Sequence, residues 1–152
     1  MEIRKILAPI DFSGRSVEEL KWATTMANVF GAELITLHVI PPEIVEVYAQ
    51  KGKDWNLMRE EVCAKTKEMV EEVGSDIGLA GLEHEEHIVS GEPVEEILRA
   101  IKLHDIDFVV VSTHGRTGVS HVLMGSVVEK LVAKSPVPML TLSEASLAAT
   151  LN

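Results

Sequence analysis

The sequence Phe108-Val109-Val110-Val111 is a run of four consecutive apolar residues. A strand with one face in water alternates apolar and polar residues, whereas a strand covered on both faces is apolar throughout. The run begins after Asp107 and ends at Ser112-Thr113, so we expect a strand over residues 107–113 that is buried on both sides. Such strands are typical of parallel sheets with helices on both faces.

Strand-like runs and helical patterns alternate on both sides of this segment. Further strands are expected at residues 4–10, 33–40, 83–90 and 137–142, and helices at residues 16–30, 58–73, 94–101 and 126–134. Residues 43–55 are expected to form a long loop or a short extra turn. Strands that alternate with helices require right-handed crossovers. We therefore predict one α/β domain over residues 1–143, with a five-stranded parallel sheet and helices on both faces, followed by a tail at residues 144–152.

Residues at the helix ends support these limits. Ser16 and Glu19 have the spacing of a capping box, in which each side chain satisfies a backbone donor at the start of a helix. Gly31 follows the first helix and suits a left-handed C-terminal cap. Glu92 and Pro93 suit the positive end and the first turn of the third helix.

Two prolines place the last strand at an edge of the sheet. Pro136 and Pro138 cannot both donate to a central ladder of hydrogen bonds. Residues 137–142 are apolar, and an unprotected apolar edge is a template for pairing with another chain. We therefore expect a homodimer that pairs residues 137–142 with their copy about a two-fold axis.

Charge and composition exclude several classes of protein. The chain of 152 residues has 14 Lys plus Arg and 24 Asp plus Glu, a net charge of -10, and no apolar run of membrane-spanning length. It has no basic stripe for nucleic acid, and its single cysteine, Cys63, excludes an internal disulfide. We expect a cytoplasmic protein that binds neither nucleic acid nor membranes.

The binding site is expected where the winding of the sheet reverses. If the first and fourth strands are neighbours, residues 9–13 line one side of a crevice and residues 112–116 the other. Gly125 and Ser126 begin a helix beside it, and a helix start with exposed N–H groups favours a phosphate. Asp11 suits ribose hydroxyls or a base amino group, so the residues point to a nucleotide.

Two general nucleotide motifs, the P-loop and G-x-G-x-x-G after the first strand, are absent. The stretch Ser112-Thr113-His114-Gly115-Arg116-Thr117-Gly118-Val119-Ser120-His121-Val122-Leu123-Met124-Gly125-Ser126 closely resembles G-x2-G-x9-G-[ST], the ATP-binding signature of the universal stress protein family. Ser112 stands at the first glycine of that signature, and its Cβ would crowd a phosphate. Further similar stretches are Ile6-Leu7-Ala8-Pro9-Ile10-Asp11-Phe12-Ser13, Leu37-His38-Val39 and Ser135-Pro136-Val137-Pro138-Met139-Leu140.

The resemblance implies a Rossmann-like fold of the adenine nucleotide alpha hydrolase type, a dimer, and a stress-linked signalling or protective protein. It also implies that ATP binds with Mg or Mn. By position, the ATP-binding residues would be Pro9, Ile10, Asp11, Ser13, Val39, Ser112, His114, Gly115, Arg116, Gly125, Ser126 and Val127.

Other functions stay open at this point. One is a protein-interaction module of the same fold with an empty pocket, and another is a nucleotidyltransferase or ATPase with Asp11 or His114 as its base. Asp11, His114 and Ser126 include the residue types of a hydrolytic triad, but no Gly-x-Ser-x-Gly elbow supports a nucleophile. We name no catalytic residue and expect hydrolysis to be slow or absent.

The remaining histidines are assigned no ligand role. His84 and His87 lie three positions apart, which on a strand puts their rings on opposite faces, so no protein metal site is expected there. His38 and His121 are interpreted as packing or rim residues.

Overall fold

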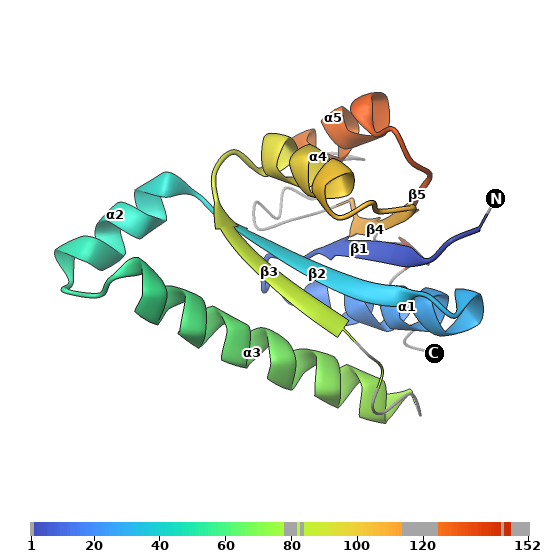
Figure 1. The fold of residues 1–152 in the computed structure, drawn as a ribbon, viewed down its shortest axis with the longest axis horizontal. Coiled ribbons are helices and arrows are strands. Elements are labelled where there is room, and N and C mark those ends of the chain that lie inside the picture. Colours follow the sequence, from blue (N-terminus) through green and yellow to red (C-terminus); the bar gives the residue numbers. More distant parts are fainter. Residues whose placement is uncertain (1, 78–81, 83, 114–124, 144, 147–152) are drawn as a thin grey trace.

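The computed structural model describes residues 2–77, 82, 84–113, 125–143 and 145–146. These residues form a five-stranded parallel sheet with helices on both faces, which confirms the predicted fold (Figure 1). Within these ranges, no helix is both long enough and apolar enough to cross a membrane.

The strands are β1 (Lys5–Pro9), β2 (Glu33–Ile40), β3 (His84–Ser90), β4 (Phe108–Ser112) and β5 (Met139–Leu142). Their order is β3-β2-β1-β4-β5, and every neighbouring pair is parallel. The first and fourth strands are therefore neighbours, which meets the condition for the expected crevice, and β5 lies at an edge, as predicted. The chain winds away from β1 in one direction and from β4 in the other, so a crevice forms beyond their carboxyl ends.

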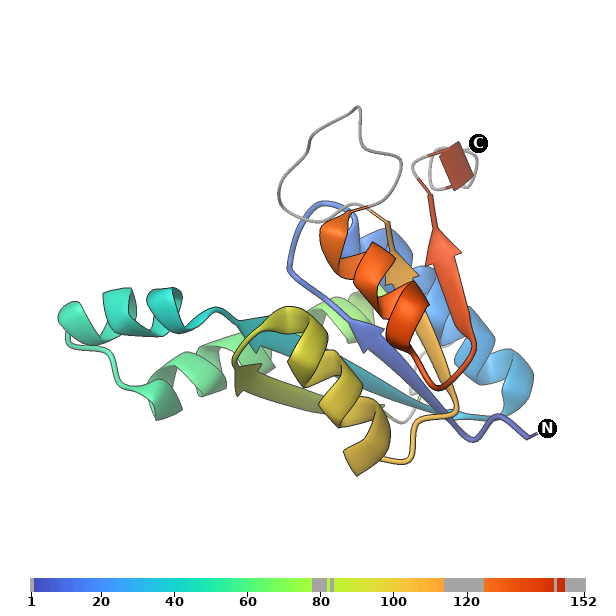
Figure 2. The same ribbon diagram turned by 90° about the horizontal axis from the view of Figure 1, so that it is seen from above.

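The helices are α1 (Ser16–Phe30), α2 (Pro42–Gln50), α3 (Trp55–Asp76), α4 (Pro93–Leu103) and α5 (Ser126–Lys134). α1 and α3 cover one face of the sheet, and α4 and α5 cover the other (Figures 1 and 2). Ile6 and Ala8 of β1 pack towards α1, whereas Leu7 packs towards α4 and α5. All three side chains are fully buried, which explains why the central strands are apolar throughout.

α2 occupies most of the segment where we expected a long loop or a short turn. Pro42 lies in its first turn, where the fixed φ of proline fits a helix. Val45 and Tyr48 pack against a small cluster that includes Met58 of α3. No residue of α2 is buried, and the helix extends beyond the sheet at one end of the molecule (Figure 2). Its nine residues give too short an apolar pattern for periodicity to define a helix.

The predicted capping box at the start of α1 is wrong. The N-cap residue is Arg15, and no side chain caps the helix there. Ser16 is already helical, and its hydroxyl donates to Asp11 Oδ1 at 3.1 Å. Glu19 is buried and accepts a hydrogen bond from the backbone of Ser112 on β4. Packing of α1 on the sheet has therefore turned both side chains away from the helix start.

Other helix ends agree with the sequence. Gly31 has φ 63°, the left-handed conformation expected of it. Glu92 is the N-cap of α4 and its side chain accepts from Glu95 N, while Pro93 lies in the first turn. α3 is longer than predicted because Asp54 caps it by accepting from Leu57 N at 2.8 Å.

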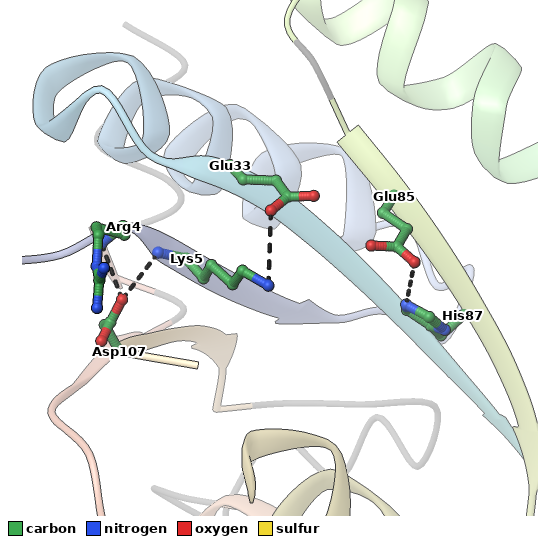
Figure 3. A network of polar contacts seen from close by, with 6 residues as sticks. All are labelled: Arg4, Lys5, Glu33, Glu85, His87 and Asp107. Carbon is green, nitrogen blue, oxygen red and sulfur yellow. Dashed lines mark hydrogen bonds and ion pairs between the residues drawn. The ribbon is translucent and has the colours of Figure 1, made fainter. Parts of the chain in front are cut away.

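A carboxylate joins the amino ends of β1 and β4. Asp107 Oδ2 accepts hydrogen bonds from the N–H groups of Arg4 at 2.9 Å and Lys5 at 3.0 Å (Figure 3). The Lys5 side chain also forms an ion pair with Glu33 on β2 at 3.9 Å. These contacts join β4, β1 and β2 at the amino ends of the strands, which lie opposite the crevice.

Candidate functional site

A cavity of about 270 Å³ opens beyond the carboxyl ends of β1 and β4. Its walls come from the ends of β1, β2 and β4, the first turns of α1, and the starts of α4 and α5. Eight of the site residues predicted from the sequence line it, namely Pro9, Ile10, Asp11, Val39, Ser112, Gly125, Ser126 and Val127. The fold thus brings the N-terminal and C-terminal parts of the predicted site together.

The other four predicted residues have different outcomes. Ser13 does not line the cavity, and its backbone N–H donates to Asp11 Oδ1 at 2.8 Å. His114, Gly115 and Arg116 lie outside the described residues, as does His121.

The wall on the β2 side is mainly apolar. Leu37 and Val39 line it, together with Ile97 of α4, which belongs to the same apolar cluster. His38 is 7% exposed, and its Nδ1–H donates to the carbonyl of Ile10 at 2.8 Å. The Phe12 ring lies 4.6 Å from the His38 ring, centroid to centroid. His38 is thus a packing residue, as the sequence suggested, and the apolar wall suits the flat face of a base.

Asp11 is held in one orientation by the segment that follows it. Its Oδ1 accepts from the Ser13 N–H at 2.8 Å and from the Ser16 hydroxyl at 3.1 Å. The intervening Phe12 has φ 58°, which is rare for a residue with a side chain. This turn presents the Asp11 carboxylate at the cavity wall, where it can accept from hydroxyl or amino groups.

Gly125 is required by a close approach of two backbone segments. Its N–H donates to the Thr113 carbonyl at 2.6 Å, and a Cβ at this position would lie 2.9 Å from the same oxygen. Gly125 is also the N-cap of α5 and supplies no side-chain acceptor for the first N–H groups of that helix. The start of α5 lines the cavity, so its N–H groups and dipole favour an anion there.

Glu19 is a cavity residue that the sequence analysis did not include. It is 3% exposed, and its Oε2 accepts from the Ser112 N–H at 3.0 Å. Burial, opposed by the hydrogen bonds from Ser112 and assisted by the charge of Asp11, raises the pKa of Glu19 to about 8. This carboxyl is therefore mostly protonated at neutral pH.

A pattern in the sequence could have located Glu19 on the inner face of α1. The buried residues of the helix include Ser16, Leu20, Ala23 and Ala27, which recur at helical spacing. Glu19 lies three residues after Ser16 and four before Ala23, so it shares their face. Because Glu19 also matches a capping box, the sequence analysis interpreted it as a capping residue and not as a buried one.

Each histidine of β3 contacts a different glutamate. His84 Nε2 lies 3.0 Å from Glu86, and His87 Nε2 lies 3.0 Å from Glu85 (Figure 3 shows the second pair). The His87 ring also contacts His104, with centroids 4.1 Å apart. In the described ranges, no group of three or more side chains is arranged to hold a metal ion.

The family model of the universal stress protein family matches residues 2–143. Universal stress protein MJ0531 of Methanocaldococcus jannaschii is 30% identical over 148 residues, which cover 93% of this chain and 82% of the relative. The solved structure of MJ0577, from the same organism, is 27% identical, has a TM-score of 0.72, and aligns over 93% of this chain and 96% of its own.

A second solved structure is the universal stress protein from Archaeoglobus fulgidus in complex with dAMP. It is 22% identical, has a TM-score of 0.59, and aligns over 93% of this chain and 98% of its own. At this identity the likeness supports the fold.

Proposed function

Because this chain belongs to the universal stress protein family, we propose that its cavity binds an adenine nucleotide, and that the ligand is ATP with Mg²⁺ or Mn²⁺. The observation that carries the proposal is the contrast between the two sides of the cavity. The β2 side is apolar and suits a base, whereas the opposite side contains the start of α5 and suits a phosphate chain. The related protein from Archaeoglobus fulgidus contains dAMP, a ligand with the same base.

The proposal assigns a role to each part of the site. Val39 and Ile10 would contact the base, and Asp11 would accept from ribose hydroxyls or the base amino group. Gly125, Ser126 and Val127 would offer N–H groups to phosphate, together with His114, Gly115 and Arg116.

A divalent cation fits this site only in company with the nucleotide. Mg²⁺ is commonly held by one or two carboxylates together with phosphate oxygens. Asp11 is assigned to the nucleoside, and the buried Glu19 carboxyl is mostly protonated at neutral pH, so the phosphate oxygens themselves would supply most of the cation's ligands. The cation would neutralise phosphate charge.

The same residues support binding with slow or no hydrolysis. Asp11 Oδ1 already accepts two hydrogen bonds, and a protonated Glu19 cannot act as a base. Neither carboxyl is therefore well suited to activate a water molecule. We propose a dimeric protein whose role in stress signalling or protection depends on nucleotide binding.

The proposed dimer uses the exposed edge of the sheet. The carbonyls of Pro138 and Leu142 accept from β4, so the backbone groups of the alternate residues, Met139 and Thr141, face away from it. These outward groups would pair with a second copy of β5 about a two-fold axis.

Calorimetry with ATP and adenosine tests the proposed ligand. If the start of α5 binds phosphate, ATP should bind at least about tenfold more tightly than adenosine. Gly125→Val should abolish this difference because its side chain enters the space beside the Thr113 carbonyl.

Gly14→Ala is the matched control, because a Cβ at Gly14 contacts nothing within 4 Å. Circular dichroism should show that both variants keep the fold. Equal affinities for ATP and adenosine would overturn the phosphate site, and no binding of either would overturn the proposed function.

A further inference from the structure

The two oxygens of the Glu19 carboxyl have different surroundings. Oε2 accepts from the Ser112 N–H at 3.0 Å. Oε1 is buried and has no hydrogen-bond partner among the described residues. Glu19 lines the proposed nucleotide cavity, so a group bound there could supply the partner that Oε1 lacks.

Among the described residues, no lysine or arginine lines the cavity beside Glu19. Asp11, after β1, is the charged group that acts on it, and the Ser112 N–H and hydroxyl are its hydrogen-bond neighbours on β4. His38 lines the cavity from β2, and the lining residues of α4 and α5 are uncharged. Burial beside a carboxylate favours the protonated form of Glu19.

The contact with Ser112 decides which oxygen holds the proton. Oε2 faces an N–H donor and therefore acts as an acceptor, so the proton of the neutral acid resides on Oε1. A buried O–H group without an acceptor is unfavourable, and an oxygen atom of a ligand would satisfy it.

Glu19 lies on the α5 side of the cavity. It binds the N–H of Ser112, and the next residue, Thr113, contacts Gly125 at the start of α5 through its carbonyl. An anion at the start of α5 would therefore lie near the Glu19 carboxyl. A phosphoryl oxygen would accept from a neutral Oε1–H, whereas an ionised carboxylate would repel it.

We propose that the Glu19 Oε1 hydroxyl donates a hydrogen bond to a phosphoryl oxygen of the bound nucleotide, so that binding requires Glu19 to be protonated. This inference rests on the proposed function and adds a pH-sensitive phosphate contact to it. ATP binding should then weaken as the pH rises through about 8, where the free protein loses this proton. Adenosine has no phosphate, and its affinity should not change.

Calorimetry of ATP and adenosine binding between about pH 7 and pH 9.5 tests the contact. Above the pKa of Glu19, the ATP affinity of the natural protein should fall up to about tenfold per pH unit, and ATP binding should take up a proton. Glu19→Gln keeps an acceptor for the Ser112 N–H and a donor at the second position. Its ATP affinity should be independent of pH, without proton uptake.

Glu18→Gln is the matched control. It removes the same charge one residue away, where Glu18 pairs with Lys21 at 3.1 Å and does not line the cavity. This variant should keep the pH dependence of the natural protein. A Glu19→Gln variant with the same pH dependence, or a natural protein without proton uptake, would overturn the inference. No binding of ATP or adenosine at pH 7 would instead overturn the proposed function, and this inference with it.

A direct titration covers the case in which Glu19→Gln does not fold. Carbon-13 NMR of glutamate carboxyls in the natural protein should show one group that titrates near pH 8, and ATP should move this titration to higher pH. The absence of such a group, or a titration unaffected by ATP, would contradict the proposal.

Discussion

Replacing Glu19 with glutamine should stabilise the protein, by an amount that grows with pH. The pKa of Glu19 is about 8 in the native state and 4.5 in its ordinary, solvated state. Between these values the native state holds a proton that the unfolded state has released, so the free energy of unfolding falls as the pH rises. Glutamine is neutral in both states and has no such dependence.

The size of the stability difference follows from the interval between the pKa of Glu19 in the native state and its pKa in the unfolded state. Each pH unit between the two pKa values is worth up to about 1.4 kcal/mol. Near pH 5 the natural protein and Glu19→Gln should differ little, at pH 7 the variant should be more stable by about 3 kcal/mol, and above pH 8 the difference should level off near about 5 kcal/mol.

Urea unfolding followed by circular dichroism, at a series of pH values from about 5 to 9, measures this difference. Glu18→Gln, which removes an equal charge at the ion pair with Lys21, should change stability by a similar amount at every pH. If the curves of Glu19→Gln and the natural protein run parallel with pH, the buried acid is not protonated as argued. If Glu19→Gln is less stable than the natural protein at pH 7, the effect has the opposite sign to the one predicted, and the reasoning is wrong.

Three further predictions concern the site and the edge of the sheet. Asp11→Ala should lose the hydrogen bonds to Ser13 and Ser16 and lower the free energy of unfolding by about 1–3 kcal/mol. Calorimetry should show weaker binding of both ATP and adenosine, and a loss confined to ATP would refute the assignment of Asp11 to the nucleoside. Light scattering should give about twice the chain mass of 16.7 kDa, and Thr141→Pro, which removes an outward N–H, should give a monomer. A natural protein that is monomeric at about micromolar concentration would contradict the dimer. Phosphate release from ATP should be far slower than the roughly 1–100 s⁻¹ of kinases, and turnover in that range, lost in Asp11→Ala, would favour an enzyme.

The sequence alone determined the architecture. The apolar run at residues 108–111 and the alternation of helical and strand-like patterns predicted the parallel sheet, and Pro136 and Pro138 predicted the edge position of β5. Gly31 and Glu92 were correctly predicted at helix ends. These features are local, because each depends on the periodicity or backbone preference of residues that are close in sequence.

The sequence also located much of the candidate site. The alternation predicted a parallel sheet, and the candidate site depended on the condition that the first and fourth strands are neighbours, which the structure meets. Asp11, Ser112 and Gly125 accordingly line one cavity. The same argument included residues 114–116, to which the family resemblance assigned a role in ATP binding, and these residues lie outside the described part of the chain.

Only the tertiary structure decided the burial and the protonation state of Glu19. Its spacing from Ser16 fits a capping box, but packing of α1 on the sheet buries both residues and gives them partners elsewhere. The partner of Glu19 is the N–H of Ser112, 93 residues away, and the partner of His38 is the carbonyl of Ile10, 28 residues away. Burial and distant hydrogen bonds set the charge of a carboxyl, and both depend on how the elements pack rather than on the residues beside it in the sequence.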